Sequence, residues 1–471
     1  MGQLVIVSNR VAIPEKDAKA RAGGLEVAVK AALKHKTGIW FGWSGKVATH
    51  TKITTQKVVH DKITYISLDL SKEDHHEYYN GFTNRVLWPI LHYRIDLAEF
   101  SRRDLSGFLR VNDHFARELH EVLGPDDIIW VHDYHLMPLA KALRELGHTN
   151  RIGFFLHIPC PPPEMLTALP HHERLIPSLC EYDLIGFQTG DDAFNFSRYL
   201  TRECGLPSRD FNFIVGDRTI RIDVFPVGIE TAAFAELARR SVRLPFVKRV
   251  IASLAARALI IGVDRLDYSK GIPQRLSAFD LFLQTQPNWR GKLTYLQIAP
   301  KSRTEIPEYA AIEQEIGSTA GRINGAFGEA DWTPIRYVNH PYSHSTLAGL
   351  YRAARVGLVT PLRDGMNLVA KEYVASQNPD DPGVLILSRF AGASQECKAA
   401  LLVNPYDPDS VAGAIGQALS MPLAERRERH DSLFRVLSHN DIQHWADRFL
   451  TALERKPTDS GRLEQMPAMR S

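Results

Sequence analysis

The chain has 471 residues, of which 57 are Lys or Arg and 54 are Asp or Glu, so its formal net charge is +3. Hydrophobic residues make up 44% and charged residues 24%, a balance that excludes an intrinsically disordered, collagen-like or disulfide-stapled chain. The length predicts two or three domains, and the small net charge gives no reason to expect nucleic-acid or membrane binding.

Short apolar runs rich in β-branched residues recur along the chain, and helical patterns separate them. Apolar residues on both faces of such runs are typical of parallel strands covered by helices on both sides. We therefore expect an α/β fold built from doubly wound parallel sheets. The predicted strands are 4–7, 39–43, 63–68, 128–131, 152–157, 184–187, 222–227, 259–263, 293–298, 356–359, 384–387 and 401–403, and the predicted helices include 24–35, 113–123, 136–146, 191–204, 272–285 and 410–420.

A seam near residues 229–256 divides this pattern into two halves. We expect Rossmann-like domains at 1–235 and 236–440, with a ligand cleft between them. An amphipathic helix within 441–455 should dock on the rest of the molecule. The tail at 456–471 contains few apolar residues, so we expect it to be mobile.

The cysteine content and the start of the chain indicate where the protein resides. The four cysteines include no C-x2-C pair, so free thiols in a reducing compartment are expected. The N-terminal M-G-Q-L-V-I-V lacks a basic region and is more typical of a strand than of a signal peptide. No apolar run approaches 18 residues. We therefore expect a cytoplasmic protein without a membrane partner.

The first polar cluster lies at the end of the first predicted strand. Arg10 ends that strand, and Gly23 and Gly24 open the next helix. Backbone N–H groups at a helix N-terminus bind phosphate, and an arginine adds a bidentate cation. The alternative is an ordinary turn into a helix.

The second cluster gathers side chains at the ends of two neighbouring strands. His132, Asp133 and His135 follow the strand at 128–131, and His157 ends the strand at 152–157. Such groups suit a hydroxyl-rich ligand or proton handling. A metal site and histidines bonded to the local backbone are the two alternatives.

The third cluster, D-R-L-D-Y-S-K-G at 264–271, follows the strand at 259–263. Arg265 and Lys270 both lie at a helix entrance, where two cations would stabilise a leaving diphosphate without a metal ion. The alternative is surface ion pairing between Arg265 and Asp267.

The fourth cluster, T-P-L-R-D-G-M-N-L-V-A-K-E at 360–372, follows the strand at 356–359. A helix starting near Met366 would direct free N–H groups into the same cleft. Asp364 could accept hydrogen bonds from sugar hydroxyls, and Glu372 could bind the vicinal diol of a ribose. Ordinary capping by Asp364 is the alternative.

Two smaller pieces complete the set of candidates. Arg303 follows the strand at 293–298, and Tyr78, Tyr79 and Trp88 cluster within 76–89. Aromatic rings with a polar atom often line sugar sites, although each piece alone is more often structural.

Taken in order, these motifs resemble the trehalose-6-phosphate synthase family over about residues 2–455. The matching motifs are V-S-N-R, A-G-G-L, W-F-G-W-S-G, Y-Y-N-G-F, L-W-P, H-D-Y-H, L-H-I-P, R-L-D-Y-S-K-G, Q-I-A-P-K-S-R, G-R-I-N-G, T-P-L-R-D-G-M-N-L-V-A-K-E and N-P-Y-D. The resemblance implies a GT-B fold whose C-terminal domain binds the donor and whose last helix crosses back to the first domain. It implies retaining transfer of glucose from UDP-glucose to glucose 6-phosphate by front-face attack.

The resemblance also assigns site residues. It implies no cofactor, no metal and a homo-oligomer, either a dimer or a tetramer. The implied acceptor residues are Arg10, Tyr79, Trp88, Asp133 and Arg303. The implied donor residues are Gly23, Gly24, Arg265, Lys270, Tyr342, Asp364, Gly365, Met366, Asn367, Leu368, Val369, Ala370, Lys371 and Glu372. The implied catalytic residues are Arg265, Lys270, His157 and Asp133, and the resemblance implies that His157 contacts the transferred glucose.

The sequence departs from the family pattern at three positions. Asp264 replaces the usual Glu, Tyr342 replaces Phe, and Cys160 replaces an aromatic residue, which is expected to loosen packing around His157 slightly. None of the three removes a charge from the site.

Three other functions fit the same fold. They are a glucosylglycerol-phosphate synthase that uses glycerol 3-phosphate, a non-catalytic sensor, and a pseudo-glycosyltransferase that joins cyclitols through a C–N bond. Tyr79 and Trp88 favour a ring-sized acceptor over glycerol 3-phosphate. A sensor should have lost at least one of four residues that are all retained: Arg265, Lys270, Asp364 and Glu372. The intact acceptor pattern around Arg10, Tyr79 and Arg303 argues against the pseudo-glycosyltransferase.

Overall fold

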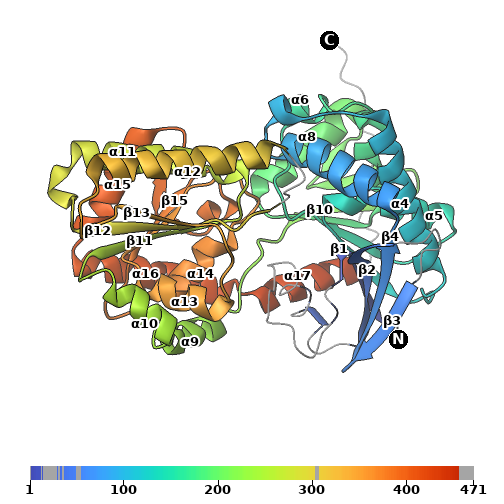
Figure 1. Cartoon of the computed structure of the whole chain (residues 1–471). Helices are drawn as coiled ribbons and strands as arrows, with labels where there is room; N and C mark the ends of the chain where they lie inside the picture. The colour runs from blue at the N-terminus through green and yellow to red at the C-terminus, as the bar shows by residue number, and fades with distance from the viewer. Residues whose placement is uncertain are drawn as a thin grey trace, which may run out of the picture.

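The computed structural model describes residues 2–11, 13, 29, 32–33, 37–48, 55–302 and 307–455. These residues form two α/β units side by side, each built around one sheet (Figure 1). Most of the predicted helix 24–35 and the predicted tail 456–471 lie outside the described residues.

The first unit holds a ten-stranded sheet in the order β3-β4-β2-β1-β5-β6-β7-β10-β9-β8. Pairing is parallel from β4 to β10, whereas β3, β9 and β8 pair in antiparallel fashion. The strands are β1 Leu4–Arg10, β2 Gly38–Val47, β3 Thr55–His60, β4 Ile63–Leu70, β5 Ile128–His132, β6 Ile152–Phe155, β7 Leu184–Phe187, β8 Ser208–Arg209, β9 Asn212–Val215 and β10 Arg218–Val224.

The second unit holds a six-stranded, fully parallel sheet in the order β13-β12-β11-β14-β15-β16. This is the 3-2-1-4-5-6 order of the Rossmann fold, and β4-β2-β1-β5-β6-β7 of the first sheet repeats it. The strands are β11 Ala258–Val263, β12 Leu293–Ile298, β13 Ile335–Val338, β14 Val356–Val359, β15 Val384–Ser388 and β16 Leu401–Val403.

Helices cover both faces of the two sheets (Figure 1). The α-helices are α2 Lys72–Asp74, α3 Trp88–Leu91, α4 Arg102–His120, α5 Leu139–Glu145, α6 Pro163–Leu166, α7 His172–Leu175, α8 Gly190–Cys204, α9 Thr231–Ser241, α10 Pro245–Ala252, α11 Ile272–Thr285, α12 Pro307–Phe327, α13 His344–Ala353, α14 Leu368–Ser376, α15 Pro408–Ser420, α16 Leu423–His439 and α17 Ile442–Glu454. A π-helical segment, η1, spans His75–Leu87, and the short 3-10 segments are η2 Ile95–Leu97, η3 Tyr134–Leu136, η4 Ile176–Glu181, η5 Tyr268–Lys270, η6 Pro287–Trp289 and η7 Gly392–Gln395.

The chain passes between the units twice, before α9 and before α17. Helix α9 packs against α13 and α14 of the second unit. Helix α17 returns to the first sheet, where Phe449 stacks on Trp130 with ring centroids 4.4 Å apart. Gly153 and Gly186 allow this approach, because a Cβ on either would lie 2.8 Å from the Phe449 ring. The precise domain boundaries, including the predicted one after residue 235, stay a prediction.

The structure confirms the predicted fold class. Each predicted strand overlaps an observed one, and the helix predicted to start near Met366 begins two residues later, at Leu368. Strands β3, β8, β9 and β13 were not predicted. The four cysteines are free, as predicted. Among the described helices, none has the length and apolar character needed to cross a membrane.

Candidate active site

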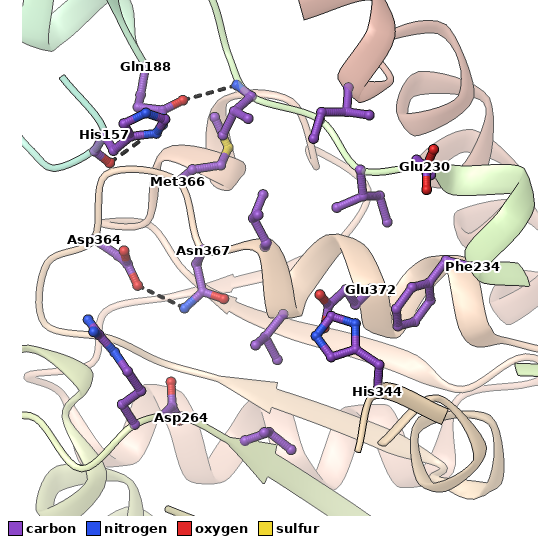
Figure 2. A pocket seen from close by; sticks show the side chains of 18 of the residues that line it. His157, Gln188, Glu230, Phe234, Asp264, His344, Asp364, Met366, Asn367 and Glu372 are labelled. Carbon is purple, nitrogen blue, oxygen red and sulfur yellow. Dashed lines mark hydrogen bonds between the residues drawn. The ribbon is translucent and has the colours of Figure 1, made fainter. Parts of the chain in front are cut away.

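A cavity of about 510 Å³ lies where the carboxyl ends of the two sheets face each other (Figure 2). In each sheet the strand order reverses direction there, between β1 and β5 and between β11 and β14. Ligands of doubly wound sheets bind at such switch points. The first unit contributes Asp133 and His157, and the second contributes the segments after β11 and β14.

Asp133 and His157 form the first unit's side of the cavity. Asp133 directly follows β5 and has a φ of 75°, which is uncommon for a residue with a side chain and typical of functional strand ends. Its Oδ1 accepts a hydrogen bond from the backbone N of His157 at 3.3 Å. Burial lowers the pKa of His157 to about 3, so its imidazole is neutral at physiological pH.

Lys270 and Asp364 meet on the opposite side. The amine Nζ of Lys270 lies 2.5 Å from Oδ2 of Asp364, and the same oxygen accepts from Nδ2 of Asn367 at 3.0 Å. Both charged side chains line the cavity and are largely buried. Arg265 is exposed, and its guanidinium lies 5.7 Å from the centre of the Trp88 ring. Two cations therefore stand at the entrance of α11.

A buried arginine holds the loops that carry these groups. Arg275 on α11 forms an ion pair with Asp264 at 2.6 Å and donates to Gln297 at 3.0 Å and to Thr360 at 2.9 Å. These three partners lie at the ends of β11, β12 and β14. Burial raises the pKa of Asp264 and the Arg275 charge opposes that shift. Asp264 thus keeps a charged partner although its side chain is shorter than the Glu expected there from the resemblance.

The N-terminus of α14 faces the cavity. Asn367, with a φ of 74°, caps the helix by accepting from the backbone N of Ala370 at 3.3 Å. One turn into the helix, the carboxyl group of Glu372 lines the cavity, and burial raises its pKa to about 7. Met366, Asn367, Leu368 and Val369 also line the cavity. The residue that caps α14 is therefore Asn367 and not Asp364, whose carboxylate is bonded to Lys270 and Asn367.

Gly365 brings the second unit against the first. A Cβ at this position would lie 2.2 Å from the carbonyl oxygen of His157, which is closer than atoms can approach. Only glycine therefore fits this contact. Ala370 and Lys371, predicted from the resemblance to be donor residues, are buried and do not line the cavity.

Two of the predicted acceptor residues, Arg10 and Tyr79, lie against Trp43, to which sequence reasoning gave no role of its own. The guanidinium of Arg10 and the ring of Tyr79 each lie 5.4 Å from the Trp43 ring. Trp88 is buried against His92, with ring centroids 3.9 Å apart. Neither Arg10, Tyr79 nor Trp88 lines the cavity itself, whereas Asp133 does.

Some predicted residues lie elsewhere. Gly23, Gly24 and Arg303 fall outside the described residues. The ring of Tyr342 packs against Phe246 at 5.3 Å and does not line the cavity.

Other lining residues were missed by sequence reasoning. They come from β7, the first crossover and the starts of α9 and α13: Gln188, Glu230, Phe234 and His344 (Figure 2). The predicted seam near 229–256 contains Glu230 and Phe234, so the crossover was predicted and only its contribution to the cavity was missed. In the described ranges, no group of three or more His, Cys, Asp or Glu side chains is arranged to hold a metal ion.

Two Rossmann-like units that share one cavity at their switch points form the GT-B architecture of nucleotide-sugar glycosyltransferases. The family model of glycosyltransferase family 20 matches residues 3–455. The chain belongs to glycosyltransferase family 20.

Curated relatives match the chain over nearly its full length. The trehalose-6-phosphate synthase of Sinorhizobium fredii is 52% identical over 456 residues, which cover 96% of this chain and 98% of that protein. The protein of the same name from Cronobacter sakazakii is 48% identical over 455 residues, covering 96% and 95%. The resemblance inferred from the motifs is confirmed.

Solved structures agree with this assignment. An α,α-trehalose-phosphate synthase (UDP-forming) from Burkholderia xenovorans, in complex with glucose-6-phosphate, superposes with a TM-score of 0.93 at 47% identity and covers 96% of this chain and 100% of that one. The Escherichia coli protein bound to UDP-2-fluoro glucose has a TM-score of 0.92 at 46% identity, covering 96% and 99%.

Proposed function

We propose that the chain transfers glucose from UDP-glucose to glucose 6-phosphate with retention, and releases α,α-trehalose 6-phosphate and UDP. The names of the relatives and the two substrate-related complexes support this reading. The observation that carries it is the shared cavity, in which Asp133 and His157 of one unit face Lys270, Asp364 and Glu372 of the other.

The second unit holds the donor in this proposal. The carboxylate of Glu372 accepts hydrogen bonds from the ribose hydroxyls, and Asp364 does so from the glucosyl group. Arg265, Lys270 and the N–H groups at the start of α14 bind the diphosphate. Because the Lys371 amine is bonded elsewhere, we propose that Leu368 to Lys371 contribute through the backbone only.

The first unit holds the acceptor. Arg10 and Tyr79, both against Trp43, lie at the carboxyl end of the first sheet with Asp133. A guanidinium suits a sugar phosphate, and an aromatic ring with a carboxylate suits its hydroxyls. Trp88 is buried, so its effect on acceptor choice acts through the position of Arg265 and the loops around it.

The reaction needs no covalent sugar–enzyme intermediate. The bond between the glucosyl C1 and the β-phosphate oxygen breaks, the acceptor hydroxyl oxygen bonds to C1 on the same face, and its proton passes to the leaving phosphate. Oδ2 of Asp364 is bonded to Lys270 and Asn367, and we assign the carboxylate to the hydroxyls of the glucosyl group and not to attack on C1. Arg265 and Lys270 stabilise the charge that develops on UDP, which is why we propose that no metal ion is required.

UDP release from UDP-glucose tests this function, measured in EDTA with glucose 6-phosphate, with glycerol 3-phosphate and without acceptor. We expect rapid release with glucose 6-phosphate only. Release with glycerol 3-phosphate instead would assign the chain to glucosylglycerol-phosphate synthesis. The absence of UDP release under all three conditions would contradict the proposal. The dimer or tetramer and the cytoplasmic location stay predictions.

A further inference from the structure

Behind His157 lies a second histidine that the proposed reaction does not use. His132 is the last residue of β5, its side chain is buried, and its Nδ1 lies 3.1 Å from Nε2 of His157. This separation is that of a hydrogen bond, so one of the two nitrogens carries a proton and the other accepts it. The state of one ring therefore determines the state of the other.

The surroundings of the pair keep both rings neutral. Trp130 and Trp445 have ring centroids 4.7 Å and 6.3 Å from His132, and Phe155 lies 4.7 Å from His157. Burial lowers the pKa of His132 well below its usual value, as it does for His157. Each ring therefore carries one proton, and the pair has only two arrangements.

The outer nitrogen of His132 distinguishes these arrangements. Among the described residues, Nε2 of His132 has no hydrogen-bond partner. A buried N–H without an acceptor is rarer in proteins than a buried acceptor without a donor. The favoured arrangement therefore places the His132 proton on Nδ1, where it is donated to Nε2 of His157. The proton of His157 then lies on Nδ1, its only other ring nitrogen, and His157 lines the cavity.

We propose that His132 is a positioning residue that holds His157 in the Nδ1–H tautomer, so that His157 presents a hydrogen-bond donor to a hydroxyl oxygen of the glucosyl group. The choice of the glucosyl group rests on the proposed function, whereas the tautomer itself does not. Helix α17 shares in this role, because its Trp445 covers both rings.

Nitrogen-15 NMR of the ¹⁵N-histidine-labelled full chain, without substrates, tests the tautomer directly. Signals are assigned by their loss in His132→Asn and His157→Asn. We expect both rings to be neutral with protons on Nδ1. A proton on Nε2 of His157, or an imidazolium at either position near neutral pH, would overturn the proposal. This readout needs no activity, so its failure is distinguishable from failure of the proposed function.

Two substitutions test the consequence for catalysis. Asparagine can donate from nearly the position of Nδ1, whereas leucine fills similar space without a donor. We expect His132→Leu to lower kcat by about tenfold, with UDP affinity unchanged because UDP lacks the glucosyl group. His132→Asn should stay within about threefold of wild type on the same reasoning. Equal kcat values for the two variants would overturn the proposal.

His430→Asn provides the matched control. His430 is also buried, but its Nε2 bonds the backbone oxygen of Val374 and it does not line the cavity. We expect it to leave kcat unchanged. If His132→Leu does not fold, the NMR result and the activity of His132→Asn still test the proposal. Loss of activity in a folded His132→Asn would contradict the role of the Nδ1 donor.

Discussion

Lys270 is held in place by an ion pair with Asp364. Its amine contacts Asp364, which is fixed in turn by Asn367 at the cap of α14. A preorganised cation of this kind stabilises charge in the transition state without a reorganisation cost. This geometry makes Lys270 the sharpest residue-scale test of the proposed chemistry.

We expect Lys270→Ala to lower kcat by about 10²–10³-fold, by analogy with the loss of an oxyanion donor. Steady-state UDP release measures this effect. Lys292→Ala is the control, since Lys292 is exposed and precedes β12, at the opposite edge of the sheet from the cavity. Turnover of Lys270→Ala near the wild-type level would refute the role assigned to the amine.

The raised pKa of Glu372 leads us to expect that donor binding depends on pH. Burial raises its pKa to about 7, and the carboxylate form is the one that accepts from ribose hydroxyls. UDP-glucose affinity should therefore fall by up to about tenfold between roughly pH 8 and pH 6. Calorimetric titration across this range measures it, and both phosphates of UDP-glucose are esterified, so the ligand does not titrate there. A Glu372→Gln variant should bind weakly and without this dependence.

The same carboxyl group affects stability in the opposite direction. Its folded pKa of about 7 exceeds the unfolded value of 4.5, so its favourable contribution is fully present below 4.5 and is lost as pH rises through 7. Glu372→Gln should therefore raise the melting temperature relative to wild type at pH values above 7, and the difference should shrink toward acid pH. A variant that is less stable than wild type in alkaline buffer would contradict this argument.

The residues that the sequence identified best are polar side chains at strand ends. Asp133, His157, Lys270 and Asp364 were predicted from segments at the ends of strands, and Glu372 was predicted from its place on the helix that follows; all five line one cavity. Residues whose role depends on tertiary packing were missed. Arg275 lies in a predicted helix and Trp43 ends a predicted strand, but neither position indicates the contacts that each residue makes with elements distant in sequence.

At the scale of elements, α14 is tied to both crossovers between the units. The amine of Lys371, which is fully buried, donates to the carbonyl of Val227 at 2.8 Å and pairs with Glu396 at 2.5 Å. Glu396 also accepts from Asn440 at 2.8 Å, in the second crossover. Lys371, which the resemblance assigned to donor binding, thus anchors α14, the helix that carries Glu372.

We expect Lys371→Met to lower the free energy of unfolding by about 3 kcal/mol, because it leaves the Glu396 carboxylate buried without its cation. Urea denaturation measures this change. The exposed Lys398→Met is the matched control and should have little effect. Adding Glu396→Gln to Lys371→Met removes the unpaired charge and should recover part of the lost free energy of unfolding. A double variant that is less stable than Lys371→Met would show that the buried charge of Glu396 is not the cause of the loss.

Elements with strong apolar runs were predicted, and those without them were not. The edge strand β3 is exposed along its whole length and pairs in antiparallel fashion, so it has no buried run to detect. Helix α16 is rich in charged residues, and its buried face contains Arg426 and His430 beside two leucines. Because two of these four buried residues are polar, the helix shows no clear apolar periodicity in the sequence. Short strands β8 and β9 form a hairpin defined by its turn.

At the scale of the whole molecule, the contact at Gly365 sets how closely the units approach. Gly365→Ala would force the second unit away from the His157 carbonyl. We expect a large loss of kcat with the secondary structure retained, checked by turnover and circular dichroism. Gly413→Ala on α15 is the control, since a Cβ there meets nothing within 4 Å and should stabilise the helix by up to about 1 kcal/mol. Unchanged turnover in Gly365→Ala would show that this contact does not position the cavity.

The two-unit plan and the ligand cleft between the units both followed from the alternation of strands and helices on either side of the seam. The order of strands in each sheet could not be predicted from the chain, because pairing depends on contacts distant in sequence. That order is what places residues 132–133 and 264–270 at facing switch points.

The product of the reaction tests the central claim most directly. Proton NMR of a mixture of the full chain, UDP-glucose and glucose 6-phosphate identifies the bond formed and the configuration at both anomeric carbons. The proposed function predicts a 1,1-linked disaccharide 6-phosphate with the α configuration on both sugars, and the front-face reaction predicts the retained α configuration of the transferred glucosyl group. A β-configured glucosyl group, or free glucose with no disaccharide, would contradict the account.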